Sequence, residues 1–475
     1  MQILTIDFET FYSQDFSLTK MTTEEYVRSP EFEVIGVSVQ VDDGEPVWFT
    51  GSMPDTEDWL KQFDWKNSLA LAHNAMFDAA ILTWLFDIRP RGWLDTLSMA
   101  RALHGTEVGG SLAKLAEHYD VGVKGEEVIT AKGLRRLDFP VDQLARYGGY
   151  CKNDVALTYA LFQRMQEYLP AVELRLIDLT VRMYSDPVLR LNPDFLKHHM
   201  AVMEQRRKEL LENFDEDVLM SNPQFADVLR GFGVEPPMKI SAATGKQTYA
   251  FAKTDEGFKA LLEHPDVNVQ NLVSARLGAK STLETTRTQR FLDIAQRTKD
   301  GLLPVPLRYY AAHTGRWGGD DKLNLQNLPR GSQLKRAIMA PPGHVIIDSD
   351  SSQIEARTLA WLAGQHDLVE VFNRNNEEIA AKVPKSEFKY DPYKLMASKI
   401  YGVPVNQVTD KQRFMGKTTI LGAGYGMGAA KFQAQLKTAG HEITEEESNR
   451  IITTYRESYP RITELWKAAN NMLPA

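Results

Sequence analysis

Four carboxylates in the first third of the chain constrain its fold more than any other feature. In TIDFET, Asp7 and Glu9 are two residues apart on a β-branched run, so a strand would point both side chains to one face. Asp78 follows an apolar run at the start of a helical pattern, and Asp154 lies within a long amphipathic segment. Tyr150 precedes Asp154 by one helical turn. We therefore expect a fold that gathers these groups from a strand and two helices.

Strand-like and helix-like segments alternate in this part of the chain. Residues 1–12 and 33–50 are rich in β-branched side chains and partly alternating, which is typical of strands. A further strand is expected in SLALAHN, and helices in MFDAAILTWLF and in residues 144–169. The first domain is therefore predicted to be α/β and to end near residue 170.

Acids placed in this way suit a phosphodiester hydrolase that uses two metal ions. In such an enzyme two Mg²⁺ ions clamp the attacking and leaving oxygens, carboxylates hold the ions, and a tyrosine orients the attacking water. Each piece alone is typical of a solvated surface, so the hypothesis depends on their joint occurrence. Asp95 is also acidic, but its setting favours a helix N-cap over a catalytic role.

Length and composition limit the remaining possibilities. A chain of 475 residues exceeds one core and suggests about three domains. No apolar run approaches the roughly 18 residues of a membrane span, and MQILTIDFET lacks the apolar core of an export signal. The single cysteine, Cys151, excludes an internal disulfide and fits a reducing cytosol. A net charge of −8 argues against indiscriminate coating of nucleic acid but is compatible with a local basic groove.

Two polar segments follow in the second half of the chain. The connector HTGRWGGDDKLNLQNLPRG is an extended segment interrupted by glycines, and alone it would be an ordinary loop. Its amides and guanidinium can bond phosphates and groove edges without reading sequence; they belong to Arg316, Asn324, Gln326 and Asn327. The stretch HVIIDSDSSQIEARTLAWLAG predicts a buried strand that turns into a helix. Asp348 and Asp350 lie at the changeover with Glu355 close behind, an arrangement typical of a divalent-metal site.

A third segment, DKQRFMGKTTILGAGYGMGAAKF, is predicted to be helical and to suit a nucleotide. Arg413, Lys417, Leu421 and Tyr425 recur at steps of four and would share one face. The two cations can neutralise a triphosphate, and the apolar and aromatic residues can stack on base and sugar. The alternative is an amphipathic helix with a solvated basic end, but its many glycines favour a close approach of backbone to a partner.

The first set of motifs resembles a known nuclease family. DFET, HNAMFD and YCKND are similar to the three motifs of DEDD-type 3′–5′ exonucleases, in the subtype with tyrosine in the third motif. The resemblance covers residues 1 to about 170. It implies that Tyr150 orients water and that Asn74 contacts substrate or shapes the second motif. It also implies four metal ligands: Asp7, Glu9, Asp78 and Asp154.

The later motifs, in their order, resemble family A DNA polymerases of phage type, in which such an exonuclease precedes the polymerase. The resemblance implies that Asp350 binds metal, Asp348 is structural, and Glu355 is a steric gate against a ribose 2′-hydroxyl. The remaining implied contacts are with nucleotide and with primer-template. For nucleotide they are Gln353, Arg413, Lys417, Leu421 and Tyr425; for DNA they are Arg316, Asn324, Gln326 and Asn327.

The implied architecture has four parts. Residues 1–170 would be a ribonuclease H-like exonuclease with a mixed sheet and helices, and 171–305 a mostly helical thumb. Residues 306–370 would form part of the palm and 371–475 the fingers of a right-hand polymerase. In the thumb, the duplex backbone would meet three cations: Lys280, Arg287 and Arg290.

Three departures from the family pattern affect the expected activity. Ser351 stands where tyrosine is usual, and Leu421 where phenylalanine or tyrosine is usual, so altered discrimination against dideoxynucleotides is expected. The family's palm carries a His-Asp pair near the C-terminus. The pair His366–Asp367 precedes the nucleotide-binding segment instead, so the C-terminal palm and its metal-binding aspartate are expected to be missing. The chain would then be truncated, or a second polypeptide would supply the rest.

The resulting prediction is a replicative DNA polymerase with proofreading, whose polymerase activity alone is doubtful. Mg²⁺, with Mn²⁺ as an alternative, would serve both sites, two ions per site. Primer-template DNA, single-stranded 3′ ends and deoxynucleoside triphosphates would be its ligands, in bacterial or phage-infected cytoplasm and away from membranes. Two alternatives remain: a stand-alone exonuclease with a DNA-holding region, and a non-catalytic DNA-binding subunit.

Overall fold

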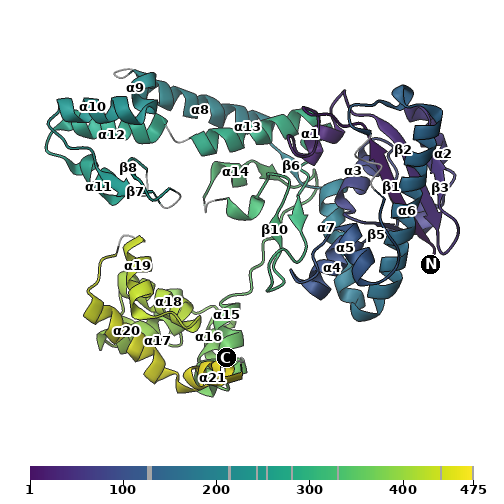
Figure 1. Ribbon diagram of the computed structural model, residues 1–475. Helices are drawn as coiled ribbons and strands as arrows, with labels where there is room; N and C mark the ends of the chain where they lie inside the picture. The colour runs from purple at the N-terminus through teal and green to yellow at the C-terminus, as the bar shows by residue number, and fades with distance from the viewer. Residues whose placement is uncertain are drawn as a thin grey trace. The chain divides into compact units, whose positions relative to one another are not determined.

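The chain forms two compact units, Met1–Ile346 and Ile347–Ala475, and each is described by itself. The computed structural model describes residues 1–125, 131–211, 215–241, 244–252, 255–279, 282–328, 331–438 and 441–472. The first unit begins with an α/β region and continues into long helices, whereas the second unit is helical (Figure 1). The boundary between the units falls within the segment predicted as the N-terminal part of the palm.

A mixed five-stranded sheet forms the centre of the α/β region. Its strands are β1 (Ile3–Thr10), β2 (Val34–Val41), β3 (Val47–Phe49), β4 (Leu69–Ala72) and β5 (Gly92–Asp95). Their order is β3–β2–β1–β4–β5; β1 runs antiparallel to β2 and parallel to β4. The strands predicted in residues 1–12, 33–50 and SLALAHN are confirmed, as is the α/β class.

Helices cover this sheet and complete its core. They are α1 (Thr23–Val27), α2 (Met53–Leu60), α3 (Met76–Trp84), α4 (Thr96–His104), α5 (Leu112–His118), α6 (Val141–Met165) and α7 (Ala171–Ser185). The helix α6 packs on β1 and β2, and α3 packs against α7. The predicted helix 144–169 is therefore confirmed with a start at Val141. Leu4, Ile6 and Phe8 are buried and alternate along β1 with Asp7 and Glu9, so the hydrophobic core fixes which way the carboxylates point.

The rest of the first unit is a long helical arm and a set of short strand pairs. In the arm, α8 (Pro193–Leu211) and α13 (Thr282–Arg297) lie side by side (Figure 1). Further helices are α9 (Glu216–Met220), α10 (Asn222–Gly231), α11 (Glu256–Ala260), α12 (Val267–Ala279) and α14 (Gln333–Arg336). The strand pairs are β6 (Arg190–Leu191) with β11 (Ile338–Met339), β7 (Met238–Ile240) with β8 (Gln247–Tyr249), and β9 (Leu307–Arg308) with β10 (Gly318–Gly319).

The second unit packs its helices around one apolar core. They are α15 (Ile354–Leu362), α16 (His366–Ala380), α17 (Pro392–Tyr401), α18 (Asp410–Gly424), α19 (Ala429–Thr438), α20 (Glu445–Ser458) and α21 (Pro460–Met472). A capping box between Thr409 and Gln412 begins α18. Gly416 then permits a close approach, because a Cβ there would lie 2.1 Å from the Tyr393 carbonyl oxygen on α17.

Two secondary-structure predictions are wrong. Residues 344–350 form no strand, and Val345 and Ile347 are 80% and 85% exposed. A strand needs hydrogen-bonded neighbours, and no described segment pairs with this one; its apolar run therefore stays extended. The continuous helix predicted over residues 410–432 also divides. Helix α18 ends at Gly424, and Gly426 adopts a left-handed φ of 72° before α19 begins.

The α17–α18 contact predicts a measurable effect of adding one methyl group. Gly416→Ala should destabilise the second unit by about 2 kcal/mol, because the two helices must move apart to admit the Cβ. Thermal unfolding followed by circular dichroism measures the effect. Gly428→Ala is the matched control, since a Cβ there meets nothing within 4 Å. Equal melting temperatures for the two variants would contradict the close contact.

Candidate active site

The central strand and two helices bring the four predicted carboxylates into one cluster. Asp7 and Glu9 share one face of β1, and Asp78 lies in the first turn of α3. The Phe8 N–H donates to Asp78 Oδ1 (3.1 Å), which ties the helix carboxylate to the strand segment between the other two. Asp154 comes from the middle of α6, and its charge raises the pKa values of Asp7 and Glu9. The cluster therefore contains all four acids that the sequence predicted.

One face of α6 lines the cluster with further polar groups. Tyr147, Cys151 and Asp154 recur at helical spacing, and the Tyr147 hydroxyl donates to Glu9. The Cys151 thiol lies 3.4 Å from both the backbone oxygen and Oδ2 of Asp7. Tyr147 was not predicted from the sequence, although its position one turn before Cys151 on the Asp154 face was a usable signal.

A strained turn positions the start of α3. Asn74 has a left-handed φ of 69°, and its N–H donates to Asp95 Oδ1 (2.8 Å). The same carboxylate accepts from the Leu97 N–H (3.1 Å) and is the N-cap of α4. The predicted N-cap role of Asp95 is confirmed. Its bond to Asn74 adds a second role, which holds the turn that precedes Asp78.

Burial and mutual repulsion raise the pKa values of Asp7, Glu9 and Asp78. Burial, followed by the charge of Asp154, raises the pKa of Asp7 to about 6. Burial and the charge of Asp7 raise the pKa values of Glu9 and Asp78 well above their usual range. Burial, then the charge of Asp154, also raises the pKa of Tyr150, so its hydroxyl keeps its proton and can donate. Such crowding of negative charge favours the binding of a cation.

Lys124 supplies a cation to this cluster and was not predicted from the sequence. Its ammonium forms an ion pair with Asp154 Oδ2 and lies 4.6 Å from the centre of the Tyr150 ring. Its charge lowers the pKa values of Asp7 and Glu9, against the effect of burial. The segment around Lys124 has no helical or strand periodicity, so only the tertiary fold brings this side chain to the acids.

The donor atoms fit hard divalent cations. Ligand atoms of Asp7, Glu9 and Cys151 lie within 4.8 Å of one another, and Asp78 is linked to the same strand by its bond to Phe8. Carboxylate oxygens are the ligands that Mg²⁺ and Mn²⁺ prefer. The thiol is the exception, because burial raises the pKa of Cys151 and keeps it protonated. Asp7 and Glu9 are therefore the carboxylates grouped closely enough to hold a metal ion, and Asp78 and Asp154 lie beside them.

The predicted DNA-contact residues of the connector are exposed but partly engaged within it. Asn324 caps a short 3₁₀ helix at Leu325–Asn327, where its side chain accepts from the Gln326 N–H (3.1 Å). The Gln326 amide donates to the Trp317 carbonyl oxygen (3.2 Å). Arg316 and Asn327 are exposed in the same connector. These contacts give the segment a defined shape.

The predicted thumb cations differ in their surroundings. Arg290 on α13 binds Glu25 and Thr22 of the α/β region, so its guanidinium is engaged within the protein. Its sequence setting on an amphipathic helix did not reveal this long-range pairing. Arg287 and Arg290 both line a cavity beside Asn324. Lys280 lies outside the described residues.

In the second unit, three of the predicted nucleotide contacts line one cavity. Glu355 from α15 and Leu421 from α18 face a space of about 160 Å³ together with Tyr425. Leu359, Ile420 and Gly424 complete its apolar wall. The helical spacing in the sequence predicted that Leu421 and Tyr425 share a face; the juxtaposition with Glu355 comes from the packing of α15 against α18.

The other predicted nucleotide contacts lie outside that cavity. Arg413 donates through Nε to Asp391 Oδ2 (2.8 Å), a buried carboxylate that caps α17, so this guanidinium already has an acidic partner. Lys417 is exposed on the next turn. Gln353 caps α15 with a left-handed φ of 58°, and its side chain bonds the Tyr393 hydroxyl.

The predicted polymerase metal ligand does not form a cluster in this structure. Asp348 and Asp350 are both exposed in the extended segment before α15. Among the described residues, the carboxylate and thiol group able to hold a metal ion contains Asp7, Glu9 and Cys151. Asp367 begins α16 and bonds Gln365 and Leu368, its neighbours in sequence. The structure thus assembles the N-terminal site more completely than the C-terminal one.

The fold places a nuclease-type α/β domain with a buried carboxylate cluster before a mostly helical region, and two family models match these two parts of the chain. The model described as 3′-5′ exonuclease matches residues 24–170, and that described as DNA polymerase family A matches residues 190–473. Because the second match covers more than half of the chain, the chain belongs to DNA polymerase family A, with a 3′–5′ exonuclease domain. The predicted family is confirmed.

Relatives include phage and bacterial proteins. The DNA polymerase of Bacillus phage SP02 is 24% identical over 525 residues, which cover 98% of this chain and 76% of the relative. DNA polymerase I of Chloroflexus aurantiacus is 27% identical over 385 residues, covering 75% of this chain and 38% of the relative. The chain thus spans about three quarters of the phage relative but little more than a third of the bacterial one.

A solved structure supports the fold. The POL domain of Pol1 from M. smegmatis, in complex with DNA primer-template and dNTP, matches with a TM-score of 0.60 and 18% identity. The match covers 98% of this chain and 74% of that one. The predicted class, an α/β exonuclease followed by a mostly helical polymerase portion, is confirmed. None of the described helices combines the length and apolar character needed to cross a membrane.

The ion pair of Lys124 predicts how the cluster responds to metal. Lys124→Met should tighten Mn²⁺ binding about fivefold at pH 8, because the ammonium no longer competes for Asp154. Titration followed by the electron paramagnetic resonance of free Mn²⁺ measures the affinity. Lys114→Met, at an exposed position on α5, is the control and should bind as the parent chain does. Unchanged or weaker binding by Lys124→Met would contradict the competition.

Proposed function

We propose that the chain hydrolyses DNA from 3′ ends at the cluster of Asp7, Glu9, Asp78 and Asp154. The observation that carries the proposal is the convergence of four carboxylates from β1, α3 and α6. Burial and neighbouring negative charge raise the pKa values of three of them, Asp7, Glu9 and Asp78. A nuclease needs such a concentration of negative charge to bind divalent cations beside a phosphodiester. The matched 3′-5′ exonuclease model supports the same assignment.

Each residue of the site would have its own role in hydrolysis. The four carboxylates would hold two Mg²⁺ ions, which when bound supply the charge that stabilises the attacking and leaving oxygens. Tyr150 retains its proton, because burial and Asp154 raise its pKa, and its hydroxyl, which bonds Asp154, would orient the attacking water. Tyr147 fixes the rotamer of Glu9 through its hydrogen bond. Asn74, next to the second motif, would contact the terminal nucleotide.

The larger part of the chain is proposed to act as the polymerase of a phage-type replicative enzyme. Its cavity beside Glu355, Leu421 and Tyr425 would accept the sugar and base of a deoxynucleoside triphosphate. Lys417 and Arg413 would meet the phosphates, with Arg413 exchanging Asp391 for the ligand. Asp350 would hold metal for nucleotidyl transfer. The primer-template would contact Arg316, Asn324, Gln326 and Asn327. It would also meet Arg287 on the arm, and Lys280 is proposed from the sequence alone.

Loss of one carboxylate tests the hydrolytic site. Asp7→Ala should lower Mg²⁺-dependent degradation of a 3′-labelled oligonucleotide about a thousandfold or more, because the cluster loses a ligand on its central strand. Gel analysis of single-stranded substrate measures the rate. Asp43→Ala removes an exposed carboxylate just beyond β2 and should leave the rate unchanged. Degradation by Asp7→Ala at the parental rate would rule out this cluster and favour a non-catalytic DNA-binding subunit.

Primer extension tests the polymerase half separately. The 475-residue chain alone should extend a primer poorly or not at all, because Asp350 has no clustered carboxylate partner among the described residues. Extension that appears only after a separate palm-containing polypeptide is added would support a split enzyme. Efficient extension by the chain alone, abolished by Asp350→Ala, would contradict the expectation of a missing aspartate. Hydrolysis without extension under either condition would favour the stand-alone exonuclease.

A further inference from the structure

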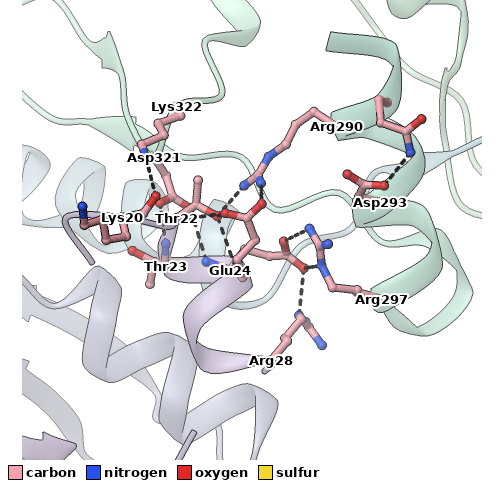
Figure 2. Close-up of polar contacts among 12 residues, drawn as sticks. Lys20, Thr22, Thr23, Glu24, Arg28, Arg290, Asp293, Arg297, Asp321 and Lys322 are labelled. Atoms are coloured by element: carbon pink, nitrogen blue, oxygen red, sulfur yellow. Dashed lines mark hydrogen bonds and ion pairs between the residues drawn. The ribbon is translucent and has the colours of Figure 1, made fainter. Parts of the chain in front are cut away.

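A second polar network lies away from the catalytic cluster, at the short helix α1. Figure 2 shows Asp321, from the connector, pointing at the start of this helix. The Thr23 N–H donates to Asp321 Oδ1 (2.6 Å), and the Glu24 N–H donates to Oδ2 (3.4 Å). The buried Tyr184 hydroxyl on α7 donates to the same Oδ2 (2.8 Å). One carboxylate thus joins the connector to two helices of the α/β region.

The backbone of the connector is unusual at this point. Asp321 and Lys322 have left-handed φ values of 49° and 55° in succession, a conformation that disfavours residues other than glycine. They form the two-residue turn between the bridged residues Asp320 and Leu323. The Lys322 ammonium donates to the Lys20 carbonyl oxygen (3.0 Å). Side-chain contacts on both turn residues therefore help to hold this conformation, which is more unusual for Lys322 than for an aspartate.

The opposite side of α1 binds the helical arm. The buried Glu24 pairs through both oxygens with Arg297 on α13, at 3.1 and 2.7 Å, and Arg290 on the same helix pairs with Glu25 (Figure 2). Tyr26 of α1 also bonds Thr10 at the end of β1 (2.9 Å). A five-residue helix is thereby fixed to the strand that carries the catalytic acids, to the arm and to the connector.

The turn at Asp321 lies next to connector residues that have a proposed role in binding DNA. Asn324 follows three residues later, and a Cβ on Gly319 would lie 2.5 Å from its Cγ, so the loop is closely packed. Asn324, Lys20 and Arg287 line a cavity of about 740 Å³ at this junction. We infer that Asp321 is a positioning residue through which α1 sets the primer-template contacts of the connector. The inference rests on the proposed function of Asn324 and its neighbours.

Binding and hydrolysis, measured separately, test this role. In Asp321→Asn the amide oxygen can still accept from the Thr23 N–H. An NH₂ group replaces the oxygen that accepts from the Glu24 N–H and the Tyr184 hydroxyl. In the Asp7→Ala background, where DNA survives, it should raise the Kd for a primer-template about fivefold, as judged by fluorescence anisotropy. With Asp7 intact, hydrolysis of single-stranded DNA should stay within about twofold of the parent rate, because the catalytic cluster does not contact Asp321.

Two further variants separate positioning from general stability. Asp293→Asn changes a carboxylate on α13 that accepts from Gln289 on its own helix (2.7 Å), and it should leave the Kd unchanged. Tyr184→Phe removes one donor to Asp321 without a change of charge and should raise the Kd in the same direction. If Asp321→Asn does not fold, the Kd of Tyr184→Phe alone tests the positioning role of Asp321.

An unchanged Kd in both Asp321→Asn and Tyr184→Phe would overturn the inference. A parallel loss of DNA binding, hydrolysis and melting temperature would also overturn it, because Asp321 would then serve the fold alone. If the parent chain fails to hydrolyse single strands while Asp321→Asn still weakens primer-template binding, the proposed hydrolysis fails and the positioning role stands.

Discussion

The structure of the N-terminal region depends on holding four carboxylates together beside one strand. Burial of like charges in a region of low dielectric is unfavourable, and the raised pKa values of Asp7, Glu9 and Asp78 express that cost. The fold offsets it with fixed groups: the Phe8 N–H on Asp78, the Tyr147 hydroxyl on Glu9 and the Lys124 ammonium on Asp154. The apolar side chains alternating along β1 hold these groups in register. The scaffold thus supplies the stability that the crowded acids lack, and the crowding of their negative charge favours a cation.

The same strand is connected to the rest of the first unit through α1. The N–H groups at the start of α1 have no partner within so short a helix, and the Asp321 carboxylate accepts hydrogen bonds from two of them. Glu24 is almost completely buried and is compensated by the guanidinium of Arg297. Removal of the Glu24 carboxylate would leave Arg297 without this partner, and removal of Arg297 would leave the buried Glu24 with only the longer ion pair to Arg28 (3.7 Å). The arrangement therefore favours one relative position of strand, arm and connector over alternatives with the same apolar burial.

Local spacing explains which parts of the site could be predicted. Asp7 and Glu9 share a face because strands have a period of two, and Tyr150 and Asp154 share one because helices have a period near 3.6. Lys124 and the pairing of Arg290 with Glu25 could not be predicted, because they join residues far apart in sequence. The strand expected at 344–350 was wrong for a related reason. An apolar run favours burial, whereas a strand also requires a neighbouring strand to accept its hydrogen bonds.

A strand needs a neighbouring strand for its hydrogen bonds, whereas a helix does not, and this requirement distinguishes the two parts of the proposed polymerase site. The cavity at Glu355, Leu421 and Tyr425 forms by the packing of α15 on α18, whose backbone hydrogen bonds are satisfied within each helix. Asp350 belongs to an extended segment whose backbone groups have no strand partner among the described residues. The cavity is therefore formed in this structure, whereas no metal-binding cluster among the described residues includes Asp350. Among the described residues no strand pairs with the segment that carries Asp350, so no sheet fixes the position of this carboxylate.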